Sequence, residues 1–329
     1  MKELRWETPT DVRSAVALLS DEPGAKALAG GTNLVDLMKL GVEQPDVLVD
    51  VDALDLRGVE DVAGGGLLIG AGVRGADLAA DPRVRERYPV LSRALLSAAS
   101  GQLRNMASTG GNLLQRTRCV YFTDPSKACN KREPGTGCPA QTGLSRELAV
   151  LGASEHCLAT HPGDMAVALA ALDAVVHVET ADGPRAVPLA DLHRLPGDAP
   201  QHDTTLPRGA LITAVELPPP LPLAASTYRK ARDRASYAFA LVSVAGVLVV
   251  ADGVVRDVRV ALGGVAHKPW RARLAEDALT GQPATAQAFG AAIDLDLAQA
   301  RPTEHNAFKV PLARRLVVGT LLELAGSDR

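Results

Sequence analysis

Aromatic residues are scarce in this chain of 329 residues, because Phe, Trp and Tyr together make up only 3% of it. So few rings argue against the stacking platform of a single-strand nucleic acid binder. The net charge of -3 provides no basic field for nucleic acid either. Although 47% of the residues are hydrophobic, no run approaches the ~20 apolar residues that span a bilayer. We therefore expect a globular protein that neither binds nucleic acid nor inserts into a membrane.

Several catalytic motifs are also missing. The chain has no G-x-S-x-G elbow, no H-E-x-x-H and no protein kinase set. Its seven histidines are scattered, and His156, beside Cys157, is the only one that we single out, as a neighbour of a possible metal cluster. Residues 1–16 contain no signal peptide, which predicts a cytoplasmic location by default. We therefore expect the chain to hold a cofactor, and we find no obvious acid–base site for a substrate.

Cysteine is absent outside one segment, residues 108–157, which contains all four: Cys119, Cys129, Cys138 and Cys157. Proline and glycine recur between them and break regular structure. A loop this long without a hydrophobic period is uncommon unless it has a function. Four thiols confined to one such loop indicate a shared task.

Four interpretations of the cysteines remain open at this point. Two disulfides would need an oxidising compartment. A zinc site usually uses C-x(2-4)-C pairs, and this sequence has none. An iron–sulfur cluster held by four thiolates tolerates irregular spacing, and Lys127, Lys131 and Arg132 would offset its negative charge unless they form a solvated face. The fourth interpretation is a set of unrelated free thiols.

A first glycine pair, Gly30-Gly31, follows a short apolar run. The pattern predicts a strand over Ala25 to Ala29, a tight turn, and a helix over Asn33 to Leu40 that Gly41 closes. Such a turn aims backbone N–H groups at one point and suits a phosphate. The sequence matches neither G-x-G-x-x-G nor a P-loop, so a purely structural turn is the alternative.

A second pair, Gly110-Gly111, stands beside Ser108, Thr109 and Asn112. Two glycine turns with polar neighbours suit a long dinucleotide, because its diphosphate and its ring both need close backbone approach. The pairing of the two turns is more informative than either turn alone.

The other elements predict an α+β protein with a boundary at the Pro-rich residues 218–222. Thr10 is expected to cap a helix through Leu19, and Asp164 a helix over Met165 to Leu172, with a ligand contact as the alternative for Asp164. Ala251-Asp252-Gly253 predicts a hairpin within 240–265. The remaining expected strands are 47–51, 67–70, 174–179, 210–217 and 226–231, and the remaining helices are 90–99, 270–279, 284–300 and 306–324.

Three stretches carry a resemblance to a known family: AGGTNLVDLMK (29–39), RNMASTGGNL (104–113) and PGDMAVALAALDA (162–174). They resemble the FAD-binding medium subunit of the molybdenum hydroxylase, or xanthine dehydrogenase, family, and the resemblance spans nearly the whole chain. The cysteine tract LLQRTRCVYFTD…CNKREPGTGCPA (113–140) is similar to the aldehyde oxidoreductase branch, whose flavin subunit carries an additional [4Fe-4S] cluster.

The resemblance implies a fold and a set of site residues. A two-part FAD-binding domain of the vanillyl-alcohol-oxidase-like type would occupy 1–220, with the cysteine-rich iron–sulfur loop at about 113–157, and a small α+β domain would occupy 221–329. The implied FAD contacts are Ala29, Gly30, Gly31, Thr32, Asn33, Leu34 and Val35 at the pyrophosphate; Ser108, Thr109, Gly110, Asn112 and Leu113 along the ribityl chain and the isoalloxazine; and Asp164 and Lys230 near the ring. The implied ligands of the cluster are Cys119, Cys129, Cys138 and Cys157.

The implied function is electron transfer in a complex. A large molybdenum-cofactor subunit would oxidise an aldehyde or heterocycle, a small subunit with two [2Fe-2S] clusters would relay electrons, and FAD would pass them to an external acceptor. A stand-alone flavin oxidase and a zinc-braced scaffold without flavin are the alternatives. For the location, export of the folded complex to the periplasm on a partner's twin-arginine signal is the alternative to the cytoplasm.

Overall fold

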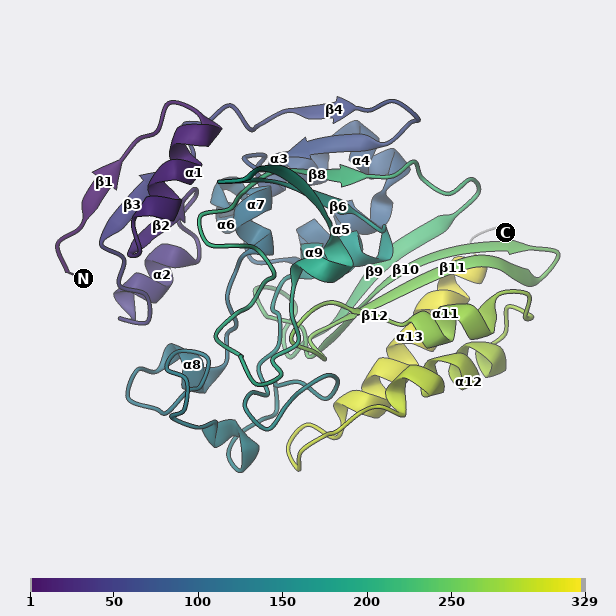
Figure 1. Ribbon diagram of the computed structural model, residues 1–329. Coiled ribbons are helices and arrows are strands. Elements are labelled where there is room, and N and C mark those ends of the chain that lie inside the picture. The colour runs from purple at the N-terminus through teal and green to yellow at the C-terminus, as the bar shows by residue number, and fades with distance from the viewer. Residues whose placement is uncertain (1, 327–329) are drawn as a thin grey trace.

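The computed structural model describes residues 2–326 and contains three sheets (Figure 1). The first sheet is parallel and lies near the N-terminus, in the order β1 (Arg5–Glu7), β3 (Val47–Asp50), β2 (Ala25–Leu28). The helix α1 (Val12–Asp21) packs its apolar face on this sheet, and α2 (Leu34–Lys39) follows the first glycine pair. This strand–turn–helix order is the one that the sequence predicted.

The second sheet is antiparallel and has five strands. Their order is β4 (Val59–Asp61), β5 (Leu67–Gly70), β8 (Leu211–Leu217), β6 (Val175–Thr180), β7 (Gly183–Pro188). The helices that accompany it are α3 (Gly75–Ala80), α4 (Pro82–Arg87), α5 (Pro89–Ser97), α6 (Gly101–Met106), α7 (Thr109–Leu113), α9 (Asp164–Ala171) and α10 (Leu189–Leu192). All eight residues of α9 are buried, because this helix lies between the second sheet and the third.

The third sheet is a meander in the order β12 (Trp270–Arg271), β11 (Val254–Gly263), β10 (Val242–Ala251), β9 (Ala225–Ala231). One of its faces is covered by three helices, α11 (Arg273–Leu279), α12 (Ala286–Leu297) and α13 (Lys309–Ala325), as Figure 1 shows. Asp252 and Gly253 have φ of 54° and 70° at the β10–β11 turn, so the predicted hairpin is confirmed.

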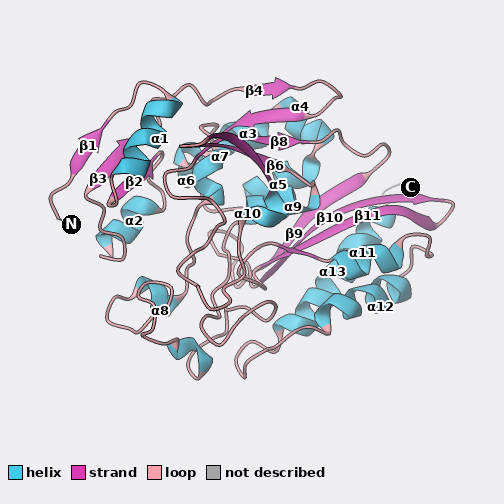
Figure 2. Ribbon diagram, viewed as in Figure 1, coloured by secondary structure: helices cyan, strands magenta, loops and turns pink. Residues whose placement is uncertain are grey.

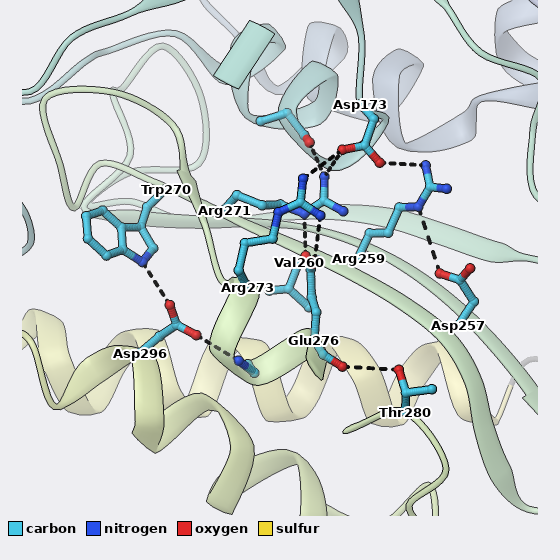
Figure 3. Close-up of polar contacts among 12 residues, drawn as sticks. Asp173, Asp257, Arg259, Val260, Trp270, Arg271, Arg273, Glu276, Thr280 and Asp296 are labelled. Carbon is cyan, nitrogen blue, oxygen red and sulfur yellow. Dashed lines mark hydrogen bonds and ion pairs between the residues drawn. The ribbon is translucent and has the colours of Figure 1, made fainter. Parts of the chain in front are cut away.

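A polar network ties the third sheet to the end of α9 (Figure 3). The carboxylate of Asp173 forms ion pairs with Arg271 at 2.8 Å, Arg259 at 3.0 Å and Arg273 at 3.1 Å. Glu276 accepts a hydrogen bond from the backbone N–H of Val260 at 2.7 Å. The three ion pairs of Asp173 therefore join β11, β12 and α11 to the end of α9.

The cysteine-bearing segment, residues 113–157, is mostly loop (Figure 2). Its only regular elements in the structure, which describes all of this segment, are α8 (Val120–Thr123) and the 3-10 turn η1 (Pro139–Gln141). Together with Leu37 of α2 it forms a hydrophobic cluster, which includes Phe122, Leu148 and three of the cysteines.

Several expected helix starts differ from the structure, and two of them have a clear cause. Asp11, not Thr10, caps α1, because its carboxylate accepts from the N–H of Ser14 while the Ser14 hydroxyl accepts from the N–H of Asp11. The helix expected from Trp270 begins at Arg273, since Trp270 and Arg271 instead pair with β11 as an edge strand. Within residues 2–326, no helix is both long and apolar enough to cross a membrane.

Candidate functional site: a glycine cleft beside a cysteine cavity

A cavity of about 860 Å³, the glycine cleft, lies between the first and second sheets. Both glycine pairs contribute to its wall, as the sequence predicted for a dinucleotide. This volume includes the space that is open to solvent. The lining residues are Ala27, Leu28, Ala29, Gly30, Gly31, Thr32, Asn33, Leu34, Val51, Asp52, Leu56, Ala71, Gly72, Ser108, Gly110, Gly111, Leu114, Leu211 and Ile212.

The first pair needs glycine at both positions. A Cβ on Gly30 would lie 1.8 Å from the carbonyl oxygen of Met106, so the two chain segments approach too closely for any side chain. Gly31 has a φ of +71°, in the region that L residues rarely adopt. The turn therefore presents bare backbone to the cleft, where a phosphate group fits.

The structure separates the expected FAD contacts into two groups. Those from Ala29 to Leu34, together with Ser108 and Gly110, line the cleft. Val35 does not, because it packs beside Leu28 under the turn. Thr109 is buried, with its hydroxyl donating to the carbonyl of Val73 at 3.0 Å.

Asn112 and Leu113 also lie off the cleft wall. The side-chain oxygen of Asn112 accepts from Gln115 at 3.0 Å. The side chain of Leu113 is fully buried, and its carbonyl oxygen lies 2.8 Å from Nε2 of His193. Any role of these two residues toward a cofactor would run through the backbone they position.

Sequence reasoning missed an ion pair in the cleft wall. Arg74 donates to both carboxylate oxygens of Asp52 at 2.6 Å, and Asp52 lines the cleft. Arg74 also donates to the carbonyl of Met106, the atom against which Gly30 packs. Asp52 lies just beyond the carboxyl end of a strand, where ligands often bind, and this position was the sequence signal that could have identified it.

Asp164 is not the cap of its helix, which corrects the first expectation for this residue. It is the first residue of α9, Gly163 is the cap, and no side-chain cap bond forms. The carboxylate instead accepts from Nζ of Lys230 at 2.8 Å and from the hydroxyl of Tyr228. Burial raises the pKa of Tyr228 well above its usual range, and the charge of Asp164 adds to this.

A second cavity, the Asp164 cavity, has a volume of about 460 Å³ and is lined by both Asp164 and Cys119. Arg118, Phe239 and Ser243 also contribute to its wall. It therefore borders both the cysteine segment and Asp164, the residue that binds Lys230 and Tyr228.

All four cysteines line a third cavity, the cysteine cavity, of about 280 Å³ including space open to solvent. They lie there with His156, Lys131 and Asn130, so the neighbour that the sequence singled out is present. Asn130 shapes the loop, since its side-chain oxygen accepts from the N–H groups of Gly135 at 3.1 Å and Gly137 at 2.7 Å. The fold thus brings the four thiols of this loop to one shared cavity.

The thiols lie close enough to affect one another's ionisation. Burial raises the pKa of Cys119, and the proximity of Cys129 and Cys138 raises it further. Burial raises the pKa of Cys157 to about 12, against the charge of Lys131, which lowers it. A group that binds as a cation would convert these thiols to thiolates.

Two interpretations of the cysteines lose support. None of the four, all of which are described, forms a disulfide. Across residues 2–326 no group of three or more His, Cys, Asp or Glu side chains is arranged to hold a single metal ion, which counts against zinc. A cluster differs from a single ion, because each thiolate binds a separate iron atom and the four sulfurs need not converge on one point.

Buried charges hold the cysteine segment against the rest of the molecule. The side chain of Lys131 is fully buried and donates to Asp203 at 2.5 Å and to the carbonyl of Pro200 at 2.7 Å. Arg116 also binds Asp203, at 2.9 Å. Burial alone would raise the pKa of Asp203, but these two cations hold it well below its usual range.

Comparison with known proteins identifies the relatives of this fold. Residues 2–220 match the model of the FAD binding domain in molybdopterin dehydrogenase, and residues 226–324 match that of the CO dehydrogenase flavoprotein C-terminal domain. The chain is 53% identical to the aldehyde oxidoreductase FAD-binding subunit PaoB of Escherichia coli (strain K12), over 98% of both chains. It is 26% identical to the glyceraldehyde dehydrogenase medium chain of Sulfolobus acidocaldarius, over 85% of this chain and 82% of that one.

Solved structures show the same arrangement. A chain of carbon monoxide dehydrogenase from Hydrogenophaga pseudoflava superposes with a TM-score of 0.77 at 26% identity, over 98% of this chain and 97% of that one. This confirms the predicted α+β fold, with an FAD-binding part followed by a C-terminal α+β part. The chain therefore is an FAD-binding oxidoreductase subunit and belongs to the medium subunits of the molybdenum hydroxylase, or xanthine dehydrogenase, family.

Proposed function

We propose that this chain is the electron-transfer subunit of a molybdenum-dependent aldehyde oxidoreductase, with FAD in the glycine cleft and a [4Fe-4S] cluster in the cysteine cavity. The observation that carries the proposal is the position of Cys119, which lines both the cysteine cavity and the Asp164 cavity. A cluster there would stand beside the cavity lined by Asp164, which is expected near the flavin ring and binds Lys230. The identity of 53% to an aldehyde oxidoreductase subunit supports aldehydes as the substrate class.

The residues present suit both groups. The bare backbone at Gly30 and Gly31 would bind the pyrophosphate, with Ser108 and Gly110 along the middle of the cofactor and Asp164 and Lys230 near the ring. Cys119, Cys129, Cys138 and Cys157 would bind the cluster, while the buried charge of Lys131 would offset its negative charge. When bound, flavin links one-electron and two-electron chemistry. We further propose a large molybdenum-cofactor subunit and a small [2Fe-2S] subunit as partners.

The division of the chain and its location belong to the same proposal. We place the FAD-binding domain at 1–220 and the C-terminal domain at 221–329, with the boundary in the Pro-rich link. We propose the cytoplasm as the location, with the periplasm as the alternative if a partner carries a twin-arginine signal. Fractionation of cells that express the whole complex distinguishes the two.

The cluster is tested by the Cys129→Ser variant in the purified complex. We expect iron and sulfide beyond the amount in the small subunit to be lost together with the broad absorbance that they cause. Ser126→Ala, an exposed substitution in the same segment, serves as the control and should keep both. Unchanged iron and sulfide in Cys129→Ser would contradict the ligand assignment.

The position of FAD is tested by Gly30→Ala. The added methyl group collides with the carbonyl oxygen of Met106 and displaces the turn, so we expect FAD to be lost from the purified chain. Gly101→Ala is a matched control, because a Cβ at that position meets no atom within 4 Å. Full flavin occupancy in Gly30→Ala, measured by absorbance after denaturation, would refute the placement of FAD.

A further inference from the structure

A fourth cavity, the histidine cavity, has a volume of about 300 Å³ including space open to solvent, and it borders the Asp164 cavity. It contains three buried histidines whose positions are far apart in the sequence. His161 and His193 are in contact, with ring centroids 4.4 Å apart, and Nε2 of His267 lies 4.0 Å from Oδ1 of Asp203. The lining residues are Leu113, Leu114, Gln115, Thr117, Thr160, His161, Pro162, His193, Asp203, Thr204 and His267.

The backbone fixes the protonation of each ring. His193 faces the carbonyl of Leu113 through Nε2, and His267 faces the carbonyl of Arg194 through Nδ1, so each of these nitrogens carries the proton. Nδ1 of His161 accepts from the N–H of Gly163 at 3.1 Å, which leaves its proton on Nε2. The second nitrogen of each ring is therefore an acceptor in His193 and His267 and a donor in His161.

These second nitrogens are buried and have no hydrogen-bond partner among the described residues. An acceptor nitrogen on His267 faces a carboxylate oxygen at a distance that is too long for a direct bond but short enough for one water to donate to both. A metal ion does not fit, because among residues 2–326 no three His, Cys, Asp or Glu side chains are arranged to hold one, and the bond from Gly163 keeps the proton on Nε2 of His161. Buried polar atoms without a protein partner are satisfied by ordered water, and all three histidines line the same cavity.

The electrostatics keep all three rings neutral. Burial lowers the pKa of His161 well below its usual range, and the neighbouring His193 lowers it further. Burial also lowers the pKa of His193. Burial and the charge of Lys131 lower the pKa of His267 to about 4, against the charge of Asp203, which raises it. A neutral ring keeps one nitrogen as a donor and the other as an acceptor. Water molecules that bind to such atoms can pass protons from one to the next.

The histidine cavity borders the Asp164 cavity on one side and a partly solvent-exposed carboxylate on the other. Thr160, His161 and Pro162 line both it and the Asp164 cavity, so it borders the place expected for the flavin ring. At the other side, the Asp203 side chain is 29% exposed and reaches solvent. Iron–sulfur clusters deliver electrons without protons, so full reduction of a flavin by two electrons and two protons needs both protons from water.

We propose that the histidine cavity binds ordered water and conducts protons from solvent at Asp203 to the flavin side at His161. In this route Oδ1 of Asp203, Nε2 of His267 and Nδ1 of His193 accept hydrogen bonds from water, and the N–H of His161 orients the last water. Each proton that leaves toward the flavin is replaced by one from bulk water at Asp203. The inference rests on the proposed function, because it needs FAD and a one-electron donor.

The test uses the whole purified complex and His267→Leu, which removes the acceptor nitrogen. Flavin reduction by dithionite is followed by rapid-mixing spectroscopy in H₂O and in D₂O. We expect the variant to keep its FAD but to take up electrons into the flavin about tenfold more slowly, less than the ~100-fold of a direct proton donor, because His267 acts through water. We also expect its solvent isotope effect to differ from that of the wild type.

His177→Gln is the matched control, since His177 lies on β6, outside the cavity, and pairs with Glu216 at 2.7 Å. It should reduce its flavin at the wild-type rate. A rate and an isotope effect in His267→Leu that equal those of the wild type, with FAD bound, would overturn proton conduction and leave the proposed function intact. A wild-type complex without FAD would overturn both.

A crystal structure of the wild-type complex tests the water site without any variant. We expect ordered water within hydrogen-bond distance of Nε2 of His161, Nδ1 of His193 and Nε2 of His267. A dry cavity, or water that contacts none of these atoms, would overturn the inference even if His267→Leu failed to fold.

Discussion

The glycine cleft and the cysteine segment are neighbours that are specified in different ways. In the cleft, helices and strands bring backbone close to backbone, and glycine is required at position 30 because a Cβ there would lie 1.8 Å from the carbonyl oxygen of Met106. In the cysteine segment, one four-residue helix and one 3-10 turn are the only regular elements of residues 113–157. Buried polar side chains, foremost Lys131 and Asn130, hold that loop in place. Substitutions of side chains should therefore be far more costly in the segment than in the cleft.

The largest effect on stability is expected for Lys131→Met. The substitution removes a fully buried cation and leaves Asp203 with Arg116 as its remaining close cation. Breaking a buried ion pair on one side costs ~3–5 kcal/mol, and we expect about 3 kcal/mol because Arg116 stays. Urea unfolding of the purified chain measures the loss.

Lys127→Met is the control for this prediction, because Lys127 lies in the same segment but is exposed. We expect its unfolding free energy to stay within ~0.5 kcal/mol of the wild type. Equal losses in the two variants would show that the ion pair with Asp203 does not hold the segment.

A smaller loss is expected for Asn130→Ala. Its side chain accepts from Gly135 and Gly137 and donates to the carbonyl of His156 at 3.1 Å. Leaving these buried backbone groups without partners should cost about 2 kcal/mol in urea unfolding. Asn130→Asp keeps both accepted bonds and should lose less; an equal loss would mean that the donated bond to His156 carries the effect.

The same contrast explains what the sequence predicted and what it did not. The glycine turns were predictable because a tight turn is a local property, and the positive φ of Gly31 agrees with it. The ion pair of Lys131 with Asp203 joins residues 72 positions apart, and no local pattern indicates it. Asp164 looked like a helix cap because its sequence neighbours allow one, but the buried Lys230 on β9 competes for the carboxylate.

The histidines were missed for a similar reason. His161, His193 and His267 belong to three separate stretches of sequence, and each was judged alone as structural. Only the folded chain shows that each has a buried nitrogen without a protein partner and that all three line one cavity. The cysteines were predictable as a group because all four lie within one short segment, although their sharing of a cavity was not.

The smallest expected effect is a change in the free energy of unfolding with pH, and it comes from Lys309. This residue joins the end of the cysteine segment to the third sheet. Its Nζ donates to the carbonyls of Leu148 at 2.9 Å and Gly264 at 2.7 Å. Burial lowers its pKa to about 7, below the usual ~10.4 of the unfolded chain. Between these two values the unfolded chain binds more protons, so the stability that Lys309 contributes rises with pH, by about 1.4 kcal/mol for each unit.

We therefore expect the unfolding free energy of the wild type to rise relative to that of Lys309→Met when the pH increases from 8 to 9. Below pH 7 both states are protonated, and the difference between the two proteins should become constant. Lys127→Met is again the control and should follow the wild type across the same range. A difference between the wild type and Lys309→Met that stays flat from pH 7 to pH 10 would show that Lys309 remains charged in the fold. The segment would then be fastened by a buried cation at this end too, as it is at Lys131.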